Sequence, residues 1–311
     1  GKWNGSGWPG NAGVHNISDD TRRQWGELVA NMSRVAPAAN STCAVAHLPF
    51  FGDSVLCPFD TIKVSDGLVD RHVHFSLPAG EPPAGGWPVV LHWQGSFFTA
   101  DLTFSAAAVF PFGALYQTRT VKNLLDEGFA VVAPEAFLGG LTFWDTNLPP
   151  WDTMIPLGQW PTAPDAVLLR NVLNAISTGA MGPLDVTHMH ATGISSGAYM
   201  TSRCGFAYGH LFRSLAIESG SFYYCGGPVC LPPLSVPDTH PPTLFLHGDL
   251  DPIVPIWTME MYAADLTLNG IHNDQVTMAL GLHQWIEQAP TVVPAWFRQW
   301  NDVDVPTAAQ A

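Results

Sequence analysis

Gly193-Ile194-Ser195-Ser196-Gly197 is the stretch of sequence that decides the fold of this chain. The pattern G-x-S-x-G is typical of a tight turn between a strand and a helix that lifts a serine out of a parallel sheet. Such a serine has a strained backbone, and a side chain at either glycine position would collide with the neighbouring strand or helix. Residues 185–192 alternate as a strand does, and residues 198–204 continue without proline as a helix does. We therefore predict a strand, a nucleophilic Ser195 and a helix in this order, the alternative being a small-residue turn without chemistry.

Strands and helices alternate on both sides of this turn. Expected strands are residues 68–77, 89–93, 129–133, 215–218, 243–247 and 275–280, and expected helices are residues 116–127, 165–176, 256–268 and 293–300. This alternation predicts an α/β fold with a mainly parallel central sheet and helices on both faces. Before it we expect one helix from Ser18 or Asp19 to about Val35, and then a loop from Pro37 to Pro58.

A tryptophan-rich insertion interrupts the alternation at residues 136–163. It contains Trp144, Trp151 and Trp160 among four prolines. A long irregular segment inside a compact α/β domain is usually a lid or a substrate-binding loop. The alternative is a surface loop that packs its tryptophans on the core.

Acid and base partners for the serine follow later strands. A serine hydroxyl needs a base to take its proton, and the base needs an acid to hold its tautomer. His247-Gly248-Asp249-Leu250-Asp251-Pro252-Ile253-Val254-Pro255 follows one apolar strand, and Gly281-Leu282-His283-Gln284-Trp285 follows the last strand. The order serine, aspartate, histidine is the one expected of this architecture.

These residues resemble the α/β-hydrolase fold and, more loosely, extracellular polyhydroxyalkanoate depolymerase-type esterases. The resemblance extends over residues 65–300 and rests on Pro88 to Gly95, on Gly128 to Ala136, on the turn at Ser195, on residues 247–255 and on residues 281–285. We expect an N-terminal extension of residues 1–60, with one helix and a disulfide loop, packed on a catalytic domain of residues 61–311.

The resemblance implies the role of each partner. The acid of such enzymes is the second aspartate of the turn, here Asp251, and the base is the histidine after the last strand, here His283. Asp249 is the alternative acid, although the earlier aspartate of this turn tends to brace the loop. His272 lies before the last strand, at the wrong end to reach Ser195.

The oxyanion formed on attack needs two N–H donors that are already in place. The amide of Ser196 is one candidate, and alignment with the family makes the amide of Gln94 the other. Trp93 stands where the family often has glycine, so Gly95 remains an alternative to Gln94.

Four tryptophans are candidate substrate-binding residues: Trp93, Trp144, Trp151 and Trp285. Together with Phe97 and Phe98 they suit a hydrophobic acyl chain, an aromatic acyl group or a polyester strand. The main hypothesis is a secreted carboxylester hydrolase that acts through an acyl-enzyme. A feruloyl or acetyl esterase on plant polysaccharide is one alternative, and a non-catalytic ligand-binding member of the fold is another.

Composition limits the partners. Hydrophobic residues make up 47% of the 311 residues, and charged residues 12%. No apolar run approaches the roughly 18 residues of a membrane span, so we expect no membrane partner. The formal net charge of −14 repels phosphate backbones, which excludes nucleic acid. We expect a monomer without a cofactor. We also expect no bound metal, because His188 and His190 have no carboxylate or cysteine at ligand spacing.

Two features favour an extracellular protein. Five cysteines include the close pairs Cys43 with Cys57 and Cys225 with Cys230, which we expect to be disulfides, whereas Cys204 is expected to be a buried free thiol. Four N-x-[ST] glycosylation sequons begin at Asn4, Asn16, Asn31 and Asn40. The chain also starts at Gly1, which we interpret as the removal of a presequence or as a cloning remnant.

Overall fold

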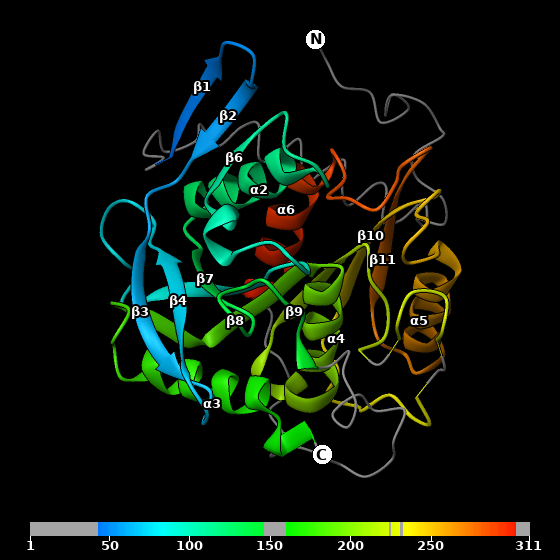
Figure 1. Cartoon of the computed structure of the whole chain (residues 1–311). Coiled ribbons are helices and arrows are strands. Elements are labelled where there is room, and N and C mark those ends of the chain that lie inside the picture. The colour runs from blue at the N-terminus through cyan, green and yellow to red at the C-terminus, as the bar shows by residue number, and fades with distance from the viewer. Residues whose placement is uncertain (1–42, 146–159, 224, 231–232, 303–311) are drawn as a thin grey trace.

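The structure is a computed structural model that describes residues 43–145, 160–223, 225–230 and 233–302 (Figure 1). The expected N-terminal helix, the four sequons and Trp151 lie outside the described residues.

Eight strands form the central sheet in the order β11-β10-β9-β8-β5-β7-β4-β3. They are β3 (Asp60–Ser65), β4 (Asp70–Ser76), β5 (Trp87–Trp93), β7 (Ala130–Pro134), β8 (Leu184–Ile194), β9 (Ser214–Glu218), β10 (Thr243–Gly248) and β11 (Asn273–Met278). Neighbouring strands from β7 to β11 run parallel, whereas β4 is antiparallel to both β3 and β7. The loops that follow β5, β8, β10 and β11 therefore leave the sheet at the same edge, where open α/β sheets place their ligands.

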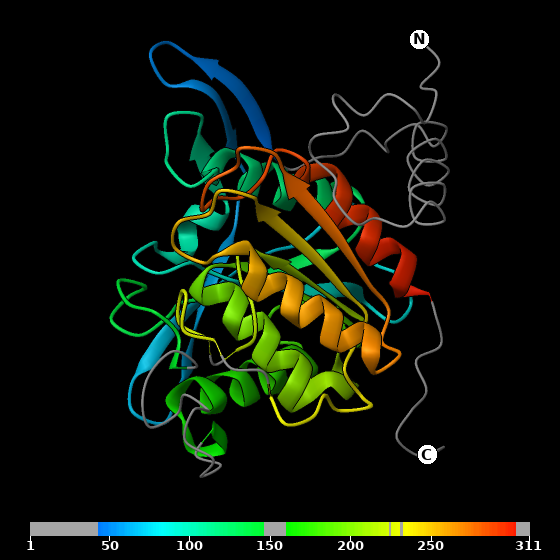
Figure 2. The same cartoon turned by 90° about the vertical axis from the view of Figure 1, so that its right-hand side faces the viewer.

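Helices cover both faces of this sheet, as expected. Helices α2 (Ala114–Asp126) and α6 (Ala289–Asn301) pack on one face, and α3 (Pro164–Ser177), α4 (Ser196–Tyr208) and α5 (Ile256–Leu268) pack on the other. The view in Figure 2 shows α6 on one side of the sheet and α4 and α5 on the opposite side.

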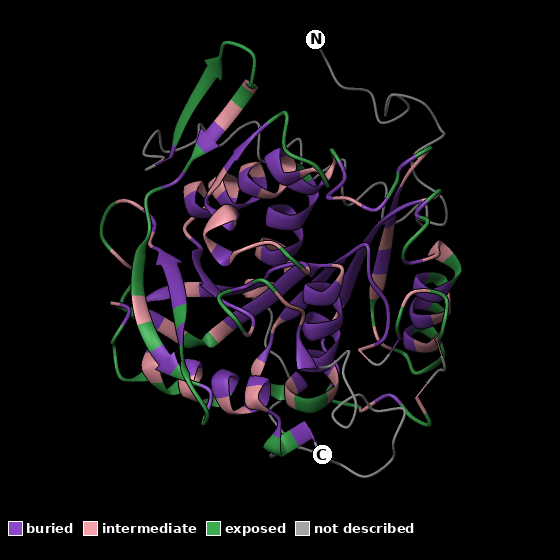
Figure 3. Cartoon of the chain, viewed as in Figure 1, coloured by how far each residue is buried: buried purple, intermediate pink, exposed green. Residues whose placement is uncertain are grey.

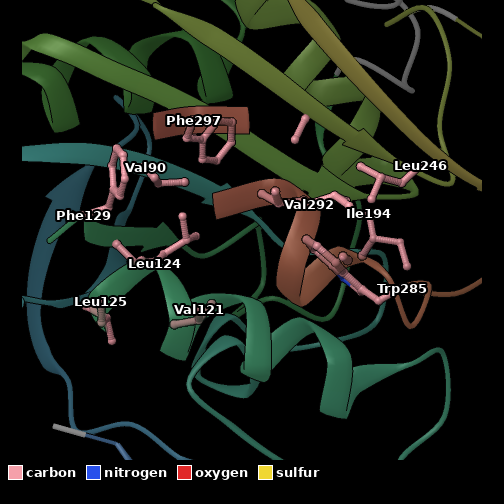
Figure 4. Packing of buried hydrophobic residues seen from close by; sticks show 14 of the residues in the cluster. Val90, Val121, Leu124, Leu125, Phe129, Ile194, Leu246, Trp285, Val292 and Phe297 are labelled. Atoms are coloured by element: carbon pink, nitrogen blue, oxygen red, sulfur yellow. The ribbon is translucent and has the colours of Figure 1, made fainter. Parts of the chain in front are cut away.

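Alternate residues of the strands supply the two cores. Val90 and Val131 pack with α2 and α6, whereas Val89 and Val132 pack with α3 and α4. The first core also contains Ile194, directly before the predicted nucleophile, and Trp285 (Figure 4). Because both faces of the sheet are covered, the inner strands are buried almost throughout (Figure 3). The strand that carries Ser195 is thus held between two packed layers.

The expectation of a loop over residues 37–58 is wrong for its described part. A hairpin of β1 (Ala44–Leu48) and β2 (Gly52–Leu56) pairs with β6 (Ser105–Ala107) in a second, three-stranded sheet. The disulfide between Cys43 and Cys57 joins the two ends of the hairpin. Both cysteines are buried, whereas most hairpin residues are exposed (Figure 3).

A buried charge cluster joins Asp145 of the insertion to β4 and α3. Arg71 on β4 contacts Asp66 at 2.6 Å and Asp165 on α3 at 2.5 Å. Asp145 and Asp165 exchange hydrogen bonds, since the backbone N–H of each donates to the carboxylate of the other. Burial, followed by the charge of Asp145, raises the pKa of Asp165 to about 7, and burial also raises the pKa of Asp145. The cluster ties the insertion to α3 and to the antiparallel strand.

This cluster should make stability depend on pH, and Asp145→Asn should weaken that dependence. An unfolded aspartate has a pKa of about 3.9, so between about pH 4 and 7 the folded chain keeps a proton on Asp165 that the unfolded chain has lost. The free energy of unfolding therefore falls as pH rises through this window. Asparagine at position 145 removes the like charge and makes the fall shallower. Urea unfolding at pH 5 and pH 8 measures the difference, with the exposed carboxylate variant Asp60→Asn as control. An unchanged pH dependence in Asp145→Asn would contradict this assignment.

Candidate active site

Ser195 occupies a sharp turn between β8 and α4. Its φ of 57° and ψ of −120° lie in a region that non-glycine residues seldom adopt. The backbone N–H of Ser195 donates to the carbonyl of Glu218 on β9 at 3.1 Å. A methyl group at Gly193 would overlap the carbonyl oxygen of Trp93, and one at Gly197 would overlap the carbonyls of Trp93 and Gln94. The two glycines therefore allow the turn to press against the end of β5, for the steric reason expected from the sequence.

The structure brings Asp251 and His283 into direct contact. Nδ1 of His283 lies 2.7 Å from Oδ2 of Asp251, and both residues are buried. The other carboxylate oxygen, Oδ1, accepts the backbone N–H groups of Ile253 and Val254 at 2.8 Å each. Burial alone would raise the pKa of Asp251, but hydrogen bonds from His247, His283 and the backbone outweigh it and lower the pKa below its ordinary value. A charged Asp251 held in this way fixes the orientation of the His283 ring.

The two rejected candidates lie elsewhere. Asp249 donates its backbone N–H to the carbonyl of Met278, which braces the turn against β11. His272 precedes β11 and stacks on Trp296, at the opposite end of that strand from His283.

Ser195 and His283 line the same apolar cavity. Its volume is about 210 Å³, and its wall consists of Gly95, Ser96, Phe97, Phe98, Phe112, Ile194, Ser195, Ile253 and His283. A narrower cavity of about 30 Å³ shares four of these residues and extends inward to Leu102, Ala114 and Trp285. Most of this surface is aromatic or aliphatic, which suits an acyl chain better than a charged ligand.

The segment after β5 lies beside Ser195. A methyl group at Gly95 would approach the β-carbon of Ser195 to 3.9 Å. The amide group of Gln94 is buried and bridges other loops, since its Nε2 donates to the carbonyl of Gly140 at 2.7 Å and its Oε1 accepts the N–H of Ala136 at 3.2 Å. The backbone of Gln94 and Gly95, and that of Ser196, thus flank the Ser195 turn.

The tryptophan predictions need correction. Trp93 and Trp144 are completely buried and pack edge to face at 5.0 Å in the core under α4, so neither lines the cavity. Trp160 is also buried. The alternative of tryptophans packed on the core describes Trp144 and Trp160, because their aromatic surface gains more from burial than from exposure at a cleft. Trp285 is also buried, and it lines the narrow inner cavity.

Other residues form the wall of the cavity, and three of them, Ser96, Phe112 and Ile253, were missed. Phe112 comes from the loop before α2, and its ring lies 6.2 Å from that of His283. Ile253 follows Asp251 by two residues, a proximity that could have indicated its place. No sequence signal marks Phe112, because it lies about 170 residues before His283 in the chain.

The cysteines pair as expected. Cys225 is joined to Cys230, in addition to the Cys43–Cys57 bridge, and Cys204 is a buried free thiol. Burial raises the pKa of the Cys204 thiol, which keeps it protonated and unreactive.

Comparison with solved structures agrees with the class that the fold defines. A carbohydrate esterase from gut microbiota, in truncated form, superposes with a TM-score of 0.55 at 14% identity, covering 80% of this chain and 98% of that one. A carboxylesterase of Bacillus cereus gives a TM-score of 0.52 at 14% identity over 74% and 94%. A dienelactone hydrolase-like promiscuous phosphotriesterase from metagenomic libraries gives 0.52 at 15% identity over 78% and 98%. At such identities the likeness shows the α/β-hydrolase fold.

Sequence comparison narrows the class to a family, although no family model matches the chain. The chain is 45% identical over 245 residues to the poly(3-hydroxyoctanoate) depolymerase of Pseudomonas fluorescens, and this covers 78% of the chain and 85% of that protein. The protein is therefore a carboxylic ester hydrolase of the α/β-hydrolase fold. It belongs to the family of polyhydroxyalkanoate depolymerase-type esterases.

Proposed function

We propose that the chain is a secreted serine hydrolase that cleaves hydrophobic or polymeric esters through an acyl-enzyme, with a polyhydroxyalkanoate-type polyester as its substrate. The observation that carries this proposal is the 2.7 Å contact between His283 and Asp251 at a cavity that Ser195 and His283 both line. Two disulfides and the named relative support the extracellular location.

In the acylation step, Oγ of Ser195 attacks the ester carbonyl carbon while Nε2 of His283 takes the hydroxyl proton. Asp251 accepts the Nδ1–H of the same ring and stabilises the imidazolium that forms. The carbonyl π-electrons move onto oxygen, where the amides of Ser196 and Gln94 donate hydrogen bonds to the oxyanion. When the tetrahedral species collapses, the ester C–O bond breaks and His283 returns the proton to the leaving alcohol.

In the deacylation step, water takes the place of the alcohol. His283 removes a proton from the water, whose oxygen attacks the acyl carbon of the Ser195 ester. Collapse of this second tetrahedral species releases a carboxylic acid and returns the proton to Oγ of Ser195. On a polyester of hydroxy acids, one product gains a hydroxyl end and the other gains a carboxyl end.

The apolar wall supports a hydrophobic acyl group. Three phenylalanines, Phe97, Phe98 and Phe112, and the aliphatic Ile194 and Ile253 line a cavity large enough for a medium-length alkyl chain. The relative is named as a depolymerase of poly(3-hydroxyoctanoate), which is a polyester. Its 45% identity favours a polyester over a feruloylated polysaccharide for this chain as well.

Partition of the acyl group tests the mechanism. Octanoate esters with different leaving alcohols should all give the same ratio of methyl octanoate to octanoic acid when methanol competes with water. One common acyl-enzyme requires this constant ratio, whereas direct attack of water on each ester makes it vary.

Clearing of a poly(3-hydroxyoctanoate) suspension, compared with hydrolysis of methyl ferulate, tests the substrate class. Turnover of the ferulate alone would favour the polysaccharide esterase.

Phe97→Ala should reduce activity on long acyl chains more than on short ones. Phe97 lines the cavity with a largely exposed ring, so its removal costs little stability. Loss of about 40 Å² of apolar contact amounts to about 1 kcal/mol, or about fivefold in kcat/KM for p-nitrophenyl octanoate, with little change for the acetate. Phe50→Ala is the matched control, because Phe50 is 98% exposed and lies on the β1–β2 hairpin. Equal losses on both esters would remove Phe97 from the acyl site.

A further inference from the structure

Trp144 connects the two backbone segments that flank the nucleophile. Its indole Nε1–H donates to the carbonyl of Gln94 at 2.9 Å, and its backbone N–H donates to Oγ of Ser196 at 2.9 Å. We infer that Trp144 is a positioning residue for the oxyanion hole, which holds both donors in place from the side opposite the substrate. The inference rests on the proposed function, because Ser196 and the Gln94 segment are its proposed donors.

The bond to Gln94 fixes a whole peptide plane. The carbonyl of Gln94 and the N–H of Gly95 belong to one rigid planar unit, so a bond that holds the carbonyl also sets the direction of the N–H. Gly95 lines the cavity beside Ser195. The bond from the indole therefore controls the orientation of the segment after β5 whether the donor is the amide of Gln94 or that of Gly95.

The hydrogen bond from the Trp144 backbone to Ser196 restrains the other proposed oxyanion donor. The hydroxyl of Ser196 belongs to the residue whose own amide is the first proposed donor, at the start of α4. A bond to this hydroxyl restrains the first turn of the helix relative to the segment of Trp144. One residue thus sets the distance between two donors that come from different strands.

Trp144 is itself rigidly held. Its side chain is completely buried and packs edge to face on Trp93. The next residue, Asp145, exchanges hydrogen bonds with Asp165 of α3. A buried indole N–H without an acceptor costs stability, so the bond to Gln94 is maintained by burial as well as by its geometry. These contacts give the oxyanion segment a fixed support.

Trp144→Phe tests the inference, because it keeps an aromatic ring and removes the indole N–H. Loss of one oxyanion donor typically costs 10²- to 10³-fold in kcat, so a loosened donor should cost on the order of tenfold. We expect a fall in kcat of about tenfold on p-nitrophenyl octanoate with little change in KM. An octyl trifluoromethyl ketone, which forms a tetrahedral oxyanion adduct with the serine, should bind about tenfold more weakly. Inhibition by 1-octanol, which occupies the acyl cavity without an oxyanion, should be unchanged.

Trp160→Phe is the matched control. Trp160 is also a buried tryptophan on the insertion, but its indole N–H has no hydrogen-bond partner among the described residues. A purely structural role of these tryptophans would lower the melting temperature and activity of both variants alike. We expect Trp160→Phe to keep the ketone affinity of the wild type. Equal ketone affinity in Trp144→Phe and wild type, or equal losses in the two variants, would overturn the inference.

Ser196→Ala serves if Trp144→Phe does not fold. This change removes the acceptor of the Trp144 backbone N–H and leaves the amide of residue 196 in place. Ser196→Ala should also weaken binding of the trifluoromethyl ketone more than binding of 1-octanol. Unchanged binding of both inhibitors would contradict the inference. If Ser195→Ala hydrolyses the ester like the wild type, the proposed function itself fails. If Ser195→Ala is inactive while Trp144→Phe and Ser196→Ala both bind the ketone normally, only the role of Trp144 fails.

Discussion

Ser195→Ala is expected to reduce kcat for p-nitrophenyl octanoate on the order of 10⁴-fold or more while leaving the fold intact. In the proposed mechanism the variant lacks the hydroxyl that forms the acyl-enzyme, and the remaining groups can only assist direct attack by water. The side chain of Ser195 makes no large contribution to the core, since it lies at the surface of the cavity. The melting temperature should therefore stay close to that of the wild type, because alanine keeps the Cβ and the backbone conformation of the turn.

A second serine gives the control for this result. Ser202 lies on the same helix α4, where its buried hydroxyl donates to the hydroxyl of Tyr262 at 3.1 Å. Ser202→Ala should retain kcat while losing some stability. Retention of more than a tenth of the wild-type kcat by Ser195→Ala would rule out its role as the nucleophile.

Asp251→Asn is expected to reduce kcat by about 10⁴-fold, because it disturbs the tautomer of His283. Oδ2 of Asp251 lies 2.7 Å from Nδ1 of His283, so a charged carboxylate keeps the proton on Nδ1 and leaves Nε2 free to act as base. Asparagine can present its NH₂ group to Nδ1, which then carries the lone pair while Nε2 carries the proton. Nε2 could no longer accept the proton of Ser195. Steady-state kinetics with p-nitrophenyl octanoate measure the loss.

Asp249→Asn is the matched change at the other aspartate of the same turn. Asp249 contacts β11 through its backbone, so the substitution should alter kcat by less than tenfold. A larger loss in Asp249→Asn than in Asp251→Asn would reverse the assignment of the acid.

The parallel part of the fold could be predicted from sequence because its signals are local. Residues 89–93 and 243–247 are short apolar runs, and both lie in inner strands of the sheet. The β1–β2 hairpin gave no such signal. All residues of β1 are exposed, and β2 finds its second partner in β6, about 50 residues further along the chain. Exposed strands lack the alternation that a buried face imposes.

The same distinction applies to the site. Asp251 and His283 could be predicted as partners because each follows a strand in a recognisable turn, and the structure places them in contact. Whether Trp144 faced a substrate or the core could not be read from its neighbours in sequence. That choice depends on Trp93 and on the carbonyl of Gln94, which come from a strand some 50 residues earlier.

The order of the strands also governs when activity can first appear during synthesis. Strand β5 pairs with β8, about 100 residues later, and the loop with His283 follows β11 near the end of the described chain. A ribosome must therefore release the chain beyond residue 283 before the pocket can close. Because such long-range pairings form slowly, regain of esterase activity should be among the last events of refolding. A nascent chain that stops before residue 283 can collapse around its first strands, but we expect it to have no esterase activity.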